Sequence, residues 1–533
     1  MSALLLLTIL WPLLLLALRA SSVLLILAPL PGLLAALFCA GDTIVFDAER
    51  LRFTLALDAP SAVLLGAAAL LWMAAGAYAA AYLGPKPNFR RFTAWWLVTQ
   101  AGSLGVFVSG DLVSFYLTYA MVSLAAYGLV IHDRTARAWR AGSIYLLLTV
   151  IGEILLLTAF ALLAFAGTGP SLAIRDVMTT LPDYANRDVV IGVILAGFGL
   201  KAGLFLLHVW LPLAHPAAPM PASAVLSGVI VKAGIIGLIR FLPFDHGLVD
   251  WGEFLGALGF LTAFYGVAIG VTQSNPKTIL AYSTVSQMGV VSAALGFGLA
   301  AAQTGAPLAA AFAASHHLFA KGALFLAVGV AYATARRRAW PVLLPVLLLV
   351  LSFGGFPLTG GAFGKAALKD QLGAGMLGWL SAFSAAGTTV LMLHFARHLR
   401  AAMPEEGAPR PAGMVVPWLA MTLAALVLPA MLYAPLGIGP LGDALKPAEL
   451  WKALWPVLLG GAGALALKRV ESRLPRIPEG DVLVLEERAY LSVSVPFSAA
   501  IDRAEAELRA WPHAGLALLL LVVGFGAALL AAR

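Results

Sequence analysis

Charged residues and cysteine are both scarce in this chain of 533 residues. Only 11% of the residues are charged and 61% are apolar, whereas a soluble domain has about 25% charged residues. Too few polar side chains remain to cover a water-exposed surface. The apolar stretches run from one end of the chain to the other, which excludes a secretory signal or a single membrane anchor. The composition therefore predicts an all-α polytopic membrane protein.

The lone thiol, Cys39, excludes several kinds of chemistry. One cysteine cannot form an internal disulfide, a cysteine-ligated iron–sulfur cluster or a cysteine-based structural zinc site. No Walker-type or dinucleotide-type glycine loop is present. We therefore expect no cofactor and no metal, and any redox chemistry would belong to a partner protein. The net charge of +8 lies in short loops between apolar stretches, so we expect no nucleic-acid partner.

Apolar stretches of about 20 residues predict about sixteen transmembrane helices. We expect three N-terminal helices with an external hairpin at residues 41–58, where apolar and polar side chains alternate. The expected division is 1–92 (helices 1–3), 93–243 (helices 4–8), 252–399 (helices 9–13), 414–468 (helices 14–15), 469–511 (a polar lateral segment) and 512–533 (a last helix). The lateral segment predicts an amphipathic helix for the membrane surface or a partner, with a solvated linker as the alternative.

Lysine and arginine recur in alternate loops, for example at Arg90, Arg137, Arg337 and Arg400. The positive-inside rule places these loops in the cytoplasm of a cell whose inner membrane holds the chain. With an even number of helices, both termini would then face the non-cytoplasmic side.

A few ionisable residues lie inside the apolar stretches. Each one costs at least about 2.5–3.5 kcal/mol at the bilayer centre, so it predicts a functional position. The candidate proton pathway comprises Glu153, Lys201, Lys232, His317, Lys321 and Lys365. Candidate relay residues are His208, His215, Lys369 and His394. For Lys369, beside Asp370, a structural ion pair is the favoured interpretation, and His208 and His215 fit a capping or interfacial role equally well.

Two of these lysines accompany breaks in their apolar stretches. Lys201 has Gly199 and Gly203 around it, and Lys365 follows a run of glycines and a proline at 354–361. Interrupted helices in corresponding positions are typical of inverted repeats with a site at the membrane midplane. We therefore predict two inverted five-helix repeats, helices 4–8 and 9–13, in which helices seven and twelve are broken.

Several runs around these lysines resemble the antiporter-like membrane subunits of respiratory complex I, membrane-bound hydrogenases and Mrp cation/proton antiporters. The runs are GLKAGLF and HVWLP at 199–212, SAVLSG leading to KAG at 223–234, LAYSTVSQ at 280–287, and HLFAKG at 317–322. The helix count and the polar lateral segment look closest to the longest complex I subunit of this type.

The resemblance implies a proton-conducting subunit of a multisubunit membrane complex, not an enzyme in itself. It would move H+, with Na+ as a candidate counter-ion, along a mid-membrane chain of Lys, Glu and His. Its partners would be the lipid bilayer, other membrane subunits and a soluble redox or zinc-containing protein. An energising subunit of a two-component CO2/bicarbonate uptake system, or a non-transporting structural subunit, are the alternatives.

One position departs from the family pattern. Where the family has a glutamate on its fifth helix, this chain has Ala120, while Asp111 before it and Ser123 after it keep the expected register. Either Glu153 replaces that glutamate as the partner of Lys201, or the coupling of this subunit is altered.

Overall fold

Helices form most of the part of the chain that the structure describes, because backbone groups in a bilayer must pair within their own segment. The computed structural model describes residues 3–17, 22–48, 51–84, 88–166, 171–408, 411–444 and 446–483. Most of the predicted lateral segment and the predicted last helix lie outside these residues. Contacts divide the chain into residues 1–479, described here, and a separate unit that begins at Gly480.

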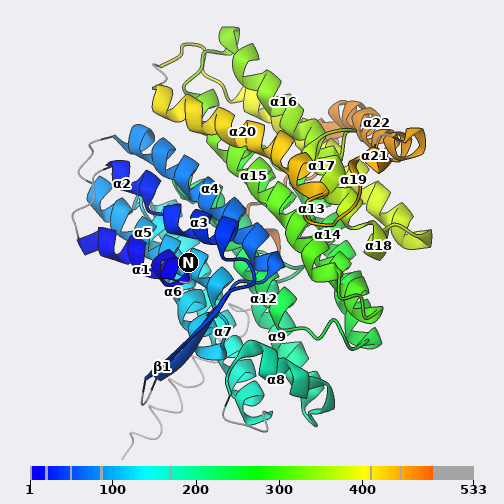
Figure 1. The fold of residues 1–533 in the computed structure, drawn as a ribbon. Coiled ribbons are helices and arrows are strands. Elements are labelled where there is room, and N and C mark those ends of the chain that lie inside the picture. Colours follow the sequence, from blue (N-terminus) through cyan, green and yellow to red (C-terminus); the bar gives the residue numbers. More distant parts are fainter. Residues whose placement is uncertain are drawn as a thin grey trace, which may run out of the picture. The chain divides into compact units, whose positions relative to one another are not determined.

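The N-terminal part contains three short helices, a hairpin and one long helix (Figure 1). Its elements are α1 (Ala3–Ala17), α2 (Ser22–Leu27), α3 (Leu30–Phe38), β1 (Thr43–Ala48), β2 (Leu51–Ala56) and α4 (Ala59–Leu83). The strands pair antiparallel, from Thr43 opposite Ala56 to Ala48 opposite Leu51, which confirms the predicted hairpin. The predicted second helix is interrupted at Ala28 and Pro29, because proline lacks the N–H that would continue it.

The next segment carries the first helix break. It comprises α5 (Phe89–Val108), α6 (Leu112–Val130), α7 (Ala136–Ala166), α8 (Ile174–Thr180), η1 (Leu181–Asp183), α9 (Arg187–Ala202), α10 (Trp210–Ala217), α11 (Met220–Val225), the π-helical turn η2 (Leu226–Ile230) and α12 (Lys232–Arg240). The last three form one continuous apolar segment from Met220 to Arg240 that is entirely buried.

The second half follows with α13 (Val249–Gly270), α14 (Pro276–Ala300), α15 (Ala306–Tyr332), η3 (Arg336–Arg338), α16 (Trp340–Gly354), α17 (Gly360–Ala367), α18 (Lys369–Leu372) and α19 (Gly375–Ala401). The described chain ends with α20 (Ala412–Tyr433), α21 (Leu441–Ala444), α22 (Pro447–Val470) and η4 (Glu471–Arg473). Among the described residues, ten helical segments are long and apolar enough to cross a membrane, and three further apolar helices are shorter.

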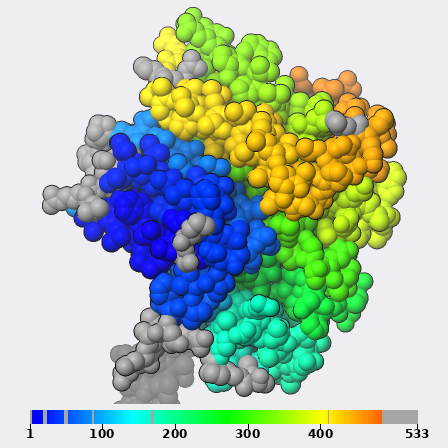
Figure 2. All heavy atoms as spheres, viewed as in Figure 1, coloured from blue at the N-terminus to red at the C-terminus, as the bar shows by residue number. Residues whose placement is uncertain are grey.

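Helix α15 forms the centre of the bundle. The apolar stretch of α15 that is long enough to cross a membrane is completely buried. The helix packs against α4, α14, α17 and α20. Figure 1 shows α15 between α4 and α20, and Figure 2 shows residues of α20, in yellow, at the surface on the same side. By contrast, most of α22 is exposed, so this helix presents an apolar surface to lipid or to another subunit.

Glycines allow the closest helix contacts. On α13, Gly252, Gly259 and Gly266 meet the backbone of α14, where an added Cβ would collide with main-chain atoms. Gly234 of α12 likewise lies against α9, and a Cβ there would come within 2.6 Å of the Ala202 nitrogen and the Phe198 oxygen. Small residues at such crossings let membrane helices approach closely.

Both predicted helix breaks are present, and their backbones share a pattern. Helix α9 ends at Gly203 with a left-handed φ of 78°, and three residues later Leu206 has a φ of 69°. Helix α16 ends at Gly355 with a φ of 87°, and three residues later Leu358 has a φ of 63°. Glycine tolerates this conformation, whereas a leucine in it is strained. The repeated arrangement supports the predicted repeat, which stays a prediction.

The contact at Gly234 gives a stability test. Gly234→Ala would force α12 and α9 apart, at a cost of about 1–3 kcal/mol for overpacking. We expect a lower midpoint in thermal unfolding of the detergent-purified protein. The matched control is Gly461→Ala on α22, where an added Cβ meets nothing within 4 Å. Its midpoint should stay equal or rise, and equal midpoints for both variants would contradict the close packing of α12 on α9.

Candidate functional site

The predicted pathway residues lie on helices that contact one another in sequence. Glu153 is on α7, Lys201 at the end of α9, Lys232 at the start of α12, His317 and Lys321 on α15, and Lys365 on α17. Helix α7 packs against α9, α9 against α12, α12 against α15, and α15 against α17. All six side chains are buried except Lys365, which is half-buried.

The first group consists of Glu153 and Lys201. The Lys201 ammonium lies 5.5 Å from the ring centres of both Tyr119 and Tyr145, which stabilise a cation through their electron-rich faces. Glu153 is the carboxylate that acts electrostatically on Lys201. Neither oxygen of Glu153 accepts a hydrogen bond from a described side chain or backbone group. A buried carboxylate in this condition is costly unless it binds a proton or water.

One face of α6 bears on the prediction that Glu153 takes the place of the glutamate absent at Ala120. Tyr116 and Tyr119 interact electrostatically with Glu153, and Ser123 lies close enough to act on Glu153 through its hydroxyl. Residue 120 is four positions after Tyr116 and three before Ser123, so it lies on the same face of the helix. A carboxylate at position 120 and the carboxylate of Glu153 would therefore approach the same region from two helices.

The second group is centred on a direct contact between Lys232 and His317. The Lys232 Nζ lies 2.6 Å from Nδ1 of His317 and donates a hydrogen bond of 2.9 Å to the Ser227 carbonyl. When Lys232 carries its proton, Nδ1 accepts and the His317 proton lies on Nε2, whereas a neutral amine can accept from Nδ1–H. Nε2 has no hydrogen-bond partner among the described residues. His317 can therefore receive a proton on one nitrogen and release another.

Lys321 extends this group by one helical turn along α15. Its Nζ donates to the Leu280 carbonyl at 2.8 Å and lies 5.2 Å from the ring centre of Phe353. Lys232 acts electrostatically on both Lys321 and His317. Since like charges repel in a medium of low polarity, the three groups cannot all be protonated without a large penalty. Their protonation states are coupled.

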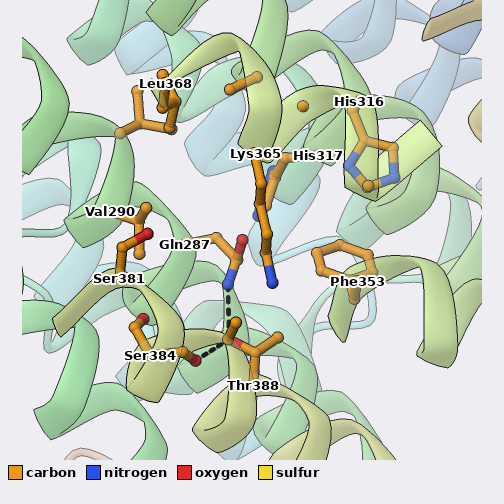
Figure 3. A pocket seen from close by; sticks show the side chains of 15 residues that line it. Gln287, Val290, His316, His317, Phe353, Lys365, Leu368, Ser381, Ser384 and Thr388 are labelled. Carbon is orange, nitrogen blue, oxygen red and sulfur yellow. Dashed lines mark hydrogen bonds between the residues drawn. The ribbon is translucent and has the colours of Figure 1, made fainter. Parts of the chain in front are cut away.

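The third group surrounds Lys365 and a cavity of about 30 Å³. This cavity is lined by Gln287, His316, His317, Lys365 and Thr388, among others. Figure 3 shows Lys365 extending beside Gln287, whose amide donates to the Thr388 hydroxyl at 2.9 Å. A cavity needs at least about 10–15 Å³ on this scale to hold one water. The space between His317 and Lys365 can therefore hold water.

Sequence reasoning missed three residues of the pathway region. His316 is buried, lines the cavity with its neighbour His317, and lies 3.1 Å through Nε2 from the Ser352 hydroxyl. Gln287 also lines the cavity. Lys277 is buried at the start of α14 and donates to the Ala218 carbonyl. Two adjacent histidines within an apolar stretch were the available signal for His316, whereas Lys277 resembles an ordinary residue of a helix start.

The candidate relay residues divide into two sets. His208 and His215 are buried on and beside the α9–α10 break, where His208 contacts Tyr265 and His215 stacks on Phe325. Lys369 has a 60% exposed side chain and pairs with Glu449 at 3.3 Å, so the structural interpretation fits it. His394 is buried, but it contacts Gln273 and Arg397 and none of the six pathway residues.

Comparisons with known proteins match the sequence to a family. Residues 109–393, more than half of the chain, match the family model described as NADH:quinone oxidoreductase/Mrp antiporter, TM. The chain is 32% identical over 240 residues to hydrogenase-4 component B of Escherichia coli, covering 43% of this chain and 35% of that protein. It is 34% identical over 328 residues to NADH-quinone oxidoreductase subunit N of Desulforudis audaxviator, covering 59% and 62%.

The fold also matches solved structures. It superposes on a chain of the Mrp complex from a Dietzia species with a TM-score of 0.78 at 23% identity, covering 95% of this chain and 60% of that chain. For an archaeal membrane-bound sulfane sulfur reductase the TM-score is 0.68 at 20% identity, covering 86% and 98%. The match to each of the curated relatives named above spans less than two thirds of that relative's length. The chain belongs to the transmembrane-subunit family of NADH:quinone oxidoreductases and Mrp antiporters.

Proposed function

We propose that this chain conducts protons as an antiporter-like subunit of a multisubunit membrane complex. The proposed order is Glu153, Lys201, Lys232, His317 with Lys321, and Lys365. The observation that carries this proposal is the buried contact of 2.6 Å between Lys232 and His317. It places an amine and an imidazole, both able to exchange protons, in direct hydrogen-bond contact away from bulk water.

The balance of buried charge supports transport over a purely structural role. Glu153 is the only buried glutamate among the described residues, whereas Lys201, Lys232, Lys277 and Lys321 are all buried. Burying several positive charges close together in an apolar medium is costly. A proton that arrives on one amine raises the energy of a proton on the next. Amines coupled in this way can pass a proton along the proposed pathway.

The helix breaks supply the hydrogen-bond acceptors that such a row needs. Lys232 donates to a carbonyl of the π-helical turn η2, and Lys365 donates to the Gly354 carbonyl, where α16 ends, at 2.5 Å. Helix ends and π-turns leave carbonyls without an intrahelical partner, whereas Lys321 uses the Leu280 carbonyl inside α14. These positions can hold a lysine in either protonation state, and the cavity beside Lys365 can admit water.

We also infer the setting of the subunit. Its partners would be other membrane subunits, which the exposed apolar faces of α7, α19 and α22 could contact. The complexes named for its relatives include hydrogenase, NADH-quinone oxidoreductase and Mrp types. A redox reaction or exchange against Na+ in the partner subunits would then drive the proton flow. The proposed location is the inner membrane, with the arginine-rich loops in the cytoplasm.

Replacing Lys201 tests the pathway. Lys201→Ala should lower proton transport at least about a hundredfold, because it removes the group that accepts and passes the proton. Transport would be measured by fluorescence quenching in inside-out vesicles from cells in which the variant replaces the native copy. The matched control is Lys369→Ala, which removes an exposed lysine and should leave the rate near that of the wild type. Membrane levels of both variants would be compared by native gel electrophoresis. Equal transport rates of the two variants at equal membrane levels of the protein would contradict the proposed pathway.

A second test addresses the substituted carboxylate. Glu153→Gln should strongly reduce transport, because the amide cannot bind and release a proton. Adding Ala120→Glu to this variant places a carboxylate on the face of α6 that already surrounds Glu153. We expect the double variant to recover a substantial part of the rate in the same vesicle assay. Undiminished transport by Glu153→Gln alone would show that Lys201 works without this partner.

A further inference from the structure

A second cluster of ionisable side chains lies away from the pathway, where the end of α19 meets η4. It consists of His394 and His398 on α19 and Glu471 at the start of η4. One ligand atom from each residue lies within 4.8 Å of the others. The two histidines are four residues apart, so they share one helix face. Glu471 is 73 residues further along the chain than His398 and reaches them only through the packing of α22 on α19.

We propose that this cluster is a zinc-binding site with His394 Nδ1, His398 Nε2 and Glu471 Oε1 as ligands. Two imidazoles and one carboxylate form a donor set that suits Zn²⁺, with one coordination position left for water. His398 Nε2 lies 2.9 Å and His394 Nδ1 lies 3.8 Å from Glu471 Oε1. The ring centres of the two histidines are 4.4 Å apart.

The contact behind His394 prepares it for a metal. Its Nε2 donates a hydrogen bond of 2.8 Å to the Gln273 carbonyl. A carbonyl only accepts, so the proton lies on Nε2 and the lone pair of Nδ1 faces Glu471. Histidines that bind metals commonly donate their other ring N–H to a backbone carbonyl, which fixes the tautomer and orients the ring. His394 is buried, so this orientation is maintained by packing.

Arg397 lies beside the proposed ligands. It pairs with Oε2 of Glu471 and donates a hydrogen bond of 3.1 Å to Nδ1 of His394. Because Arg397 takes the other carboxylate oxygen, Oε1 is left to the histidines. The Arg397 side chain is 33% exposed, so it can turn toward solvent when a cation binds. The charge of Lys468 also faces the neighbouring groove and would weaken binding to some extent.

The cluster is also accessible. The side chains of His398 and Glu471 are 21% and 31% exposed, and a groove of about 190 Å³ lined by His394, Arg397 and Lys468 lies beside it. A bound ion would join α19 to the end of α22 and, through Gln273, to the turn between α13 and α14. The ion would therefore hold these helices together at the ends that we expect to face the cytoplasm. This role does not depend on the proposed proton pathway.

Metal binding by the full chain, purified without a polyhistidine tag and treated with a chelator, tests this site. We expect one Zn²⁺ per chain by isothermal titration and elemental analysis, and an intense visible absorption when Co²⁺ replaces it in a tetrahedral site. His398→Gln and Glu471→Gln should each weaken zinc binding at least about tenfold. Zinc should also raise the melting midpoint of the wild type, because a ligand that binds the folded state stabilises it, and should not do so in these variants.

The matched control is His246→Gln. His246 also contacts a carboxylate, Asp245 at 3.0 Å, but both side chains are more than half exposed and the pair is not part of the described three-ligand cluster. This variant should bind zinc as the wild type does. His394→Gln would weaken binding as well, and His398, which is more exposed, gives the variant less prone to misfolding. No zinc uptake by the wild type, or equal affinity in the wild type and His398→Gln, would overturn the proposal and leave an ionic contact only.

Discussion

The cost of burying positive charge in an apolar bundle governs this structure. Each lysine of the proposed pathway has a specific form of compensation: Glu153 and two tyrosine rings for Lys201, the Ser227 carbonyl and His317 for Lys232, the Leu280 carbonyl for Lys321, and the Gly354 carbonyl for Lys365. Apart from Glu153, none of these partners carries a full negative charge in its ordinary state. The compensation is therefore enough to bury an amine but not to fix it as a permanent ion pair. A buried ion pair would hold its proton, whereas these contacts allow it to leave.

The helix irregularities serve the same purpose. The π-helical turn before Lys232 and the end of α16 beside Lys365 both provide carbonyls with capacity to accept from an amine. The two breaks share the pattern of a left-handed glycine followed three residues later by a left-handed leucine. Strained leucine backbones persist only where surrounding packing maintains them. The packing of α12 against α9 and of η2 and α12 against α15 brings Lys232 beside His317 and is therefore part of the site.

In the proposed pathway, a different helix supplies the carboxylate that the family pattern has at the position of Ala120. That carboxylate, Glu153, is on α7, and Tyr119 and Ser123 of α6 lie close to it. The proposed zinc cluster is formed by a different part of the structure. It depends on the packing of η4 and α22 against α19, more than 200 residues further along the chain than Glu153. It uses none of the residues of the proposed proton pathway.

The sequence by itself determined the class of protein, because its composition cannot cover a soluble surface. It also determined which lysines lie within apolar stretches and where α9 and α16 break, since glycine and proline act on the local backbone. The tertiary structure decided the rest: that His317 faces Lys232 while His316 faces Ser352, that Lys369 reaches the surface, and that Glu471 meets His398. These pairings depend on the rotation and spacing of helices far apart in the chain, which the pattern of apolar residues leaves undetermined.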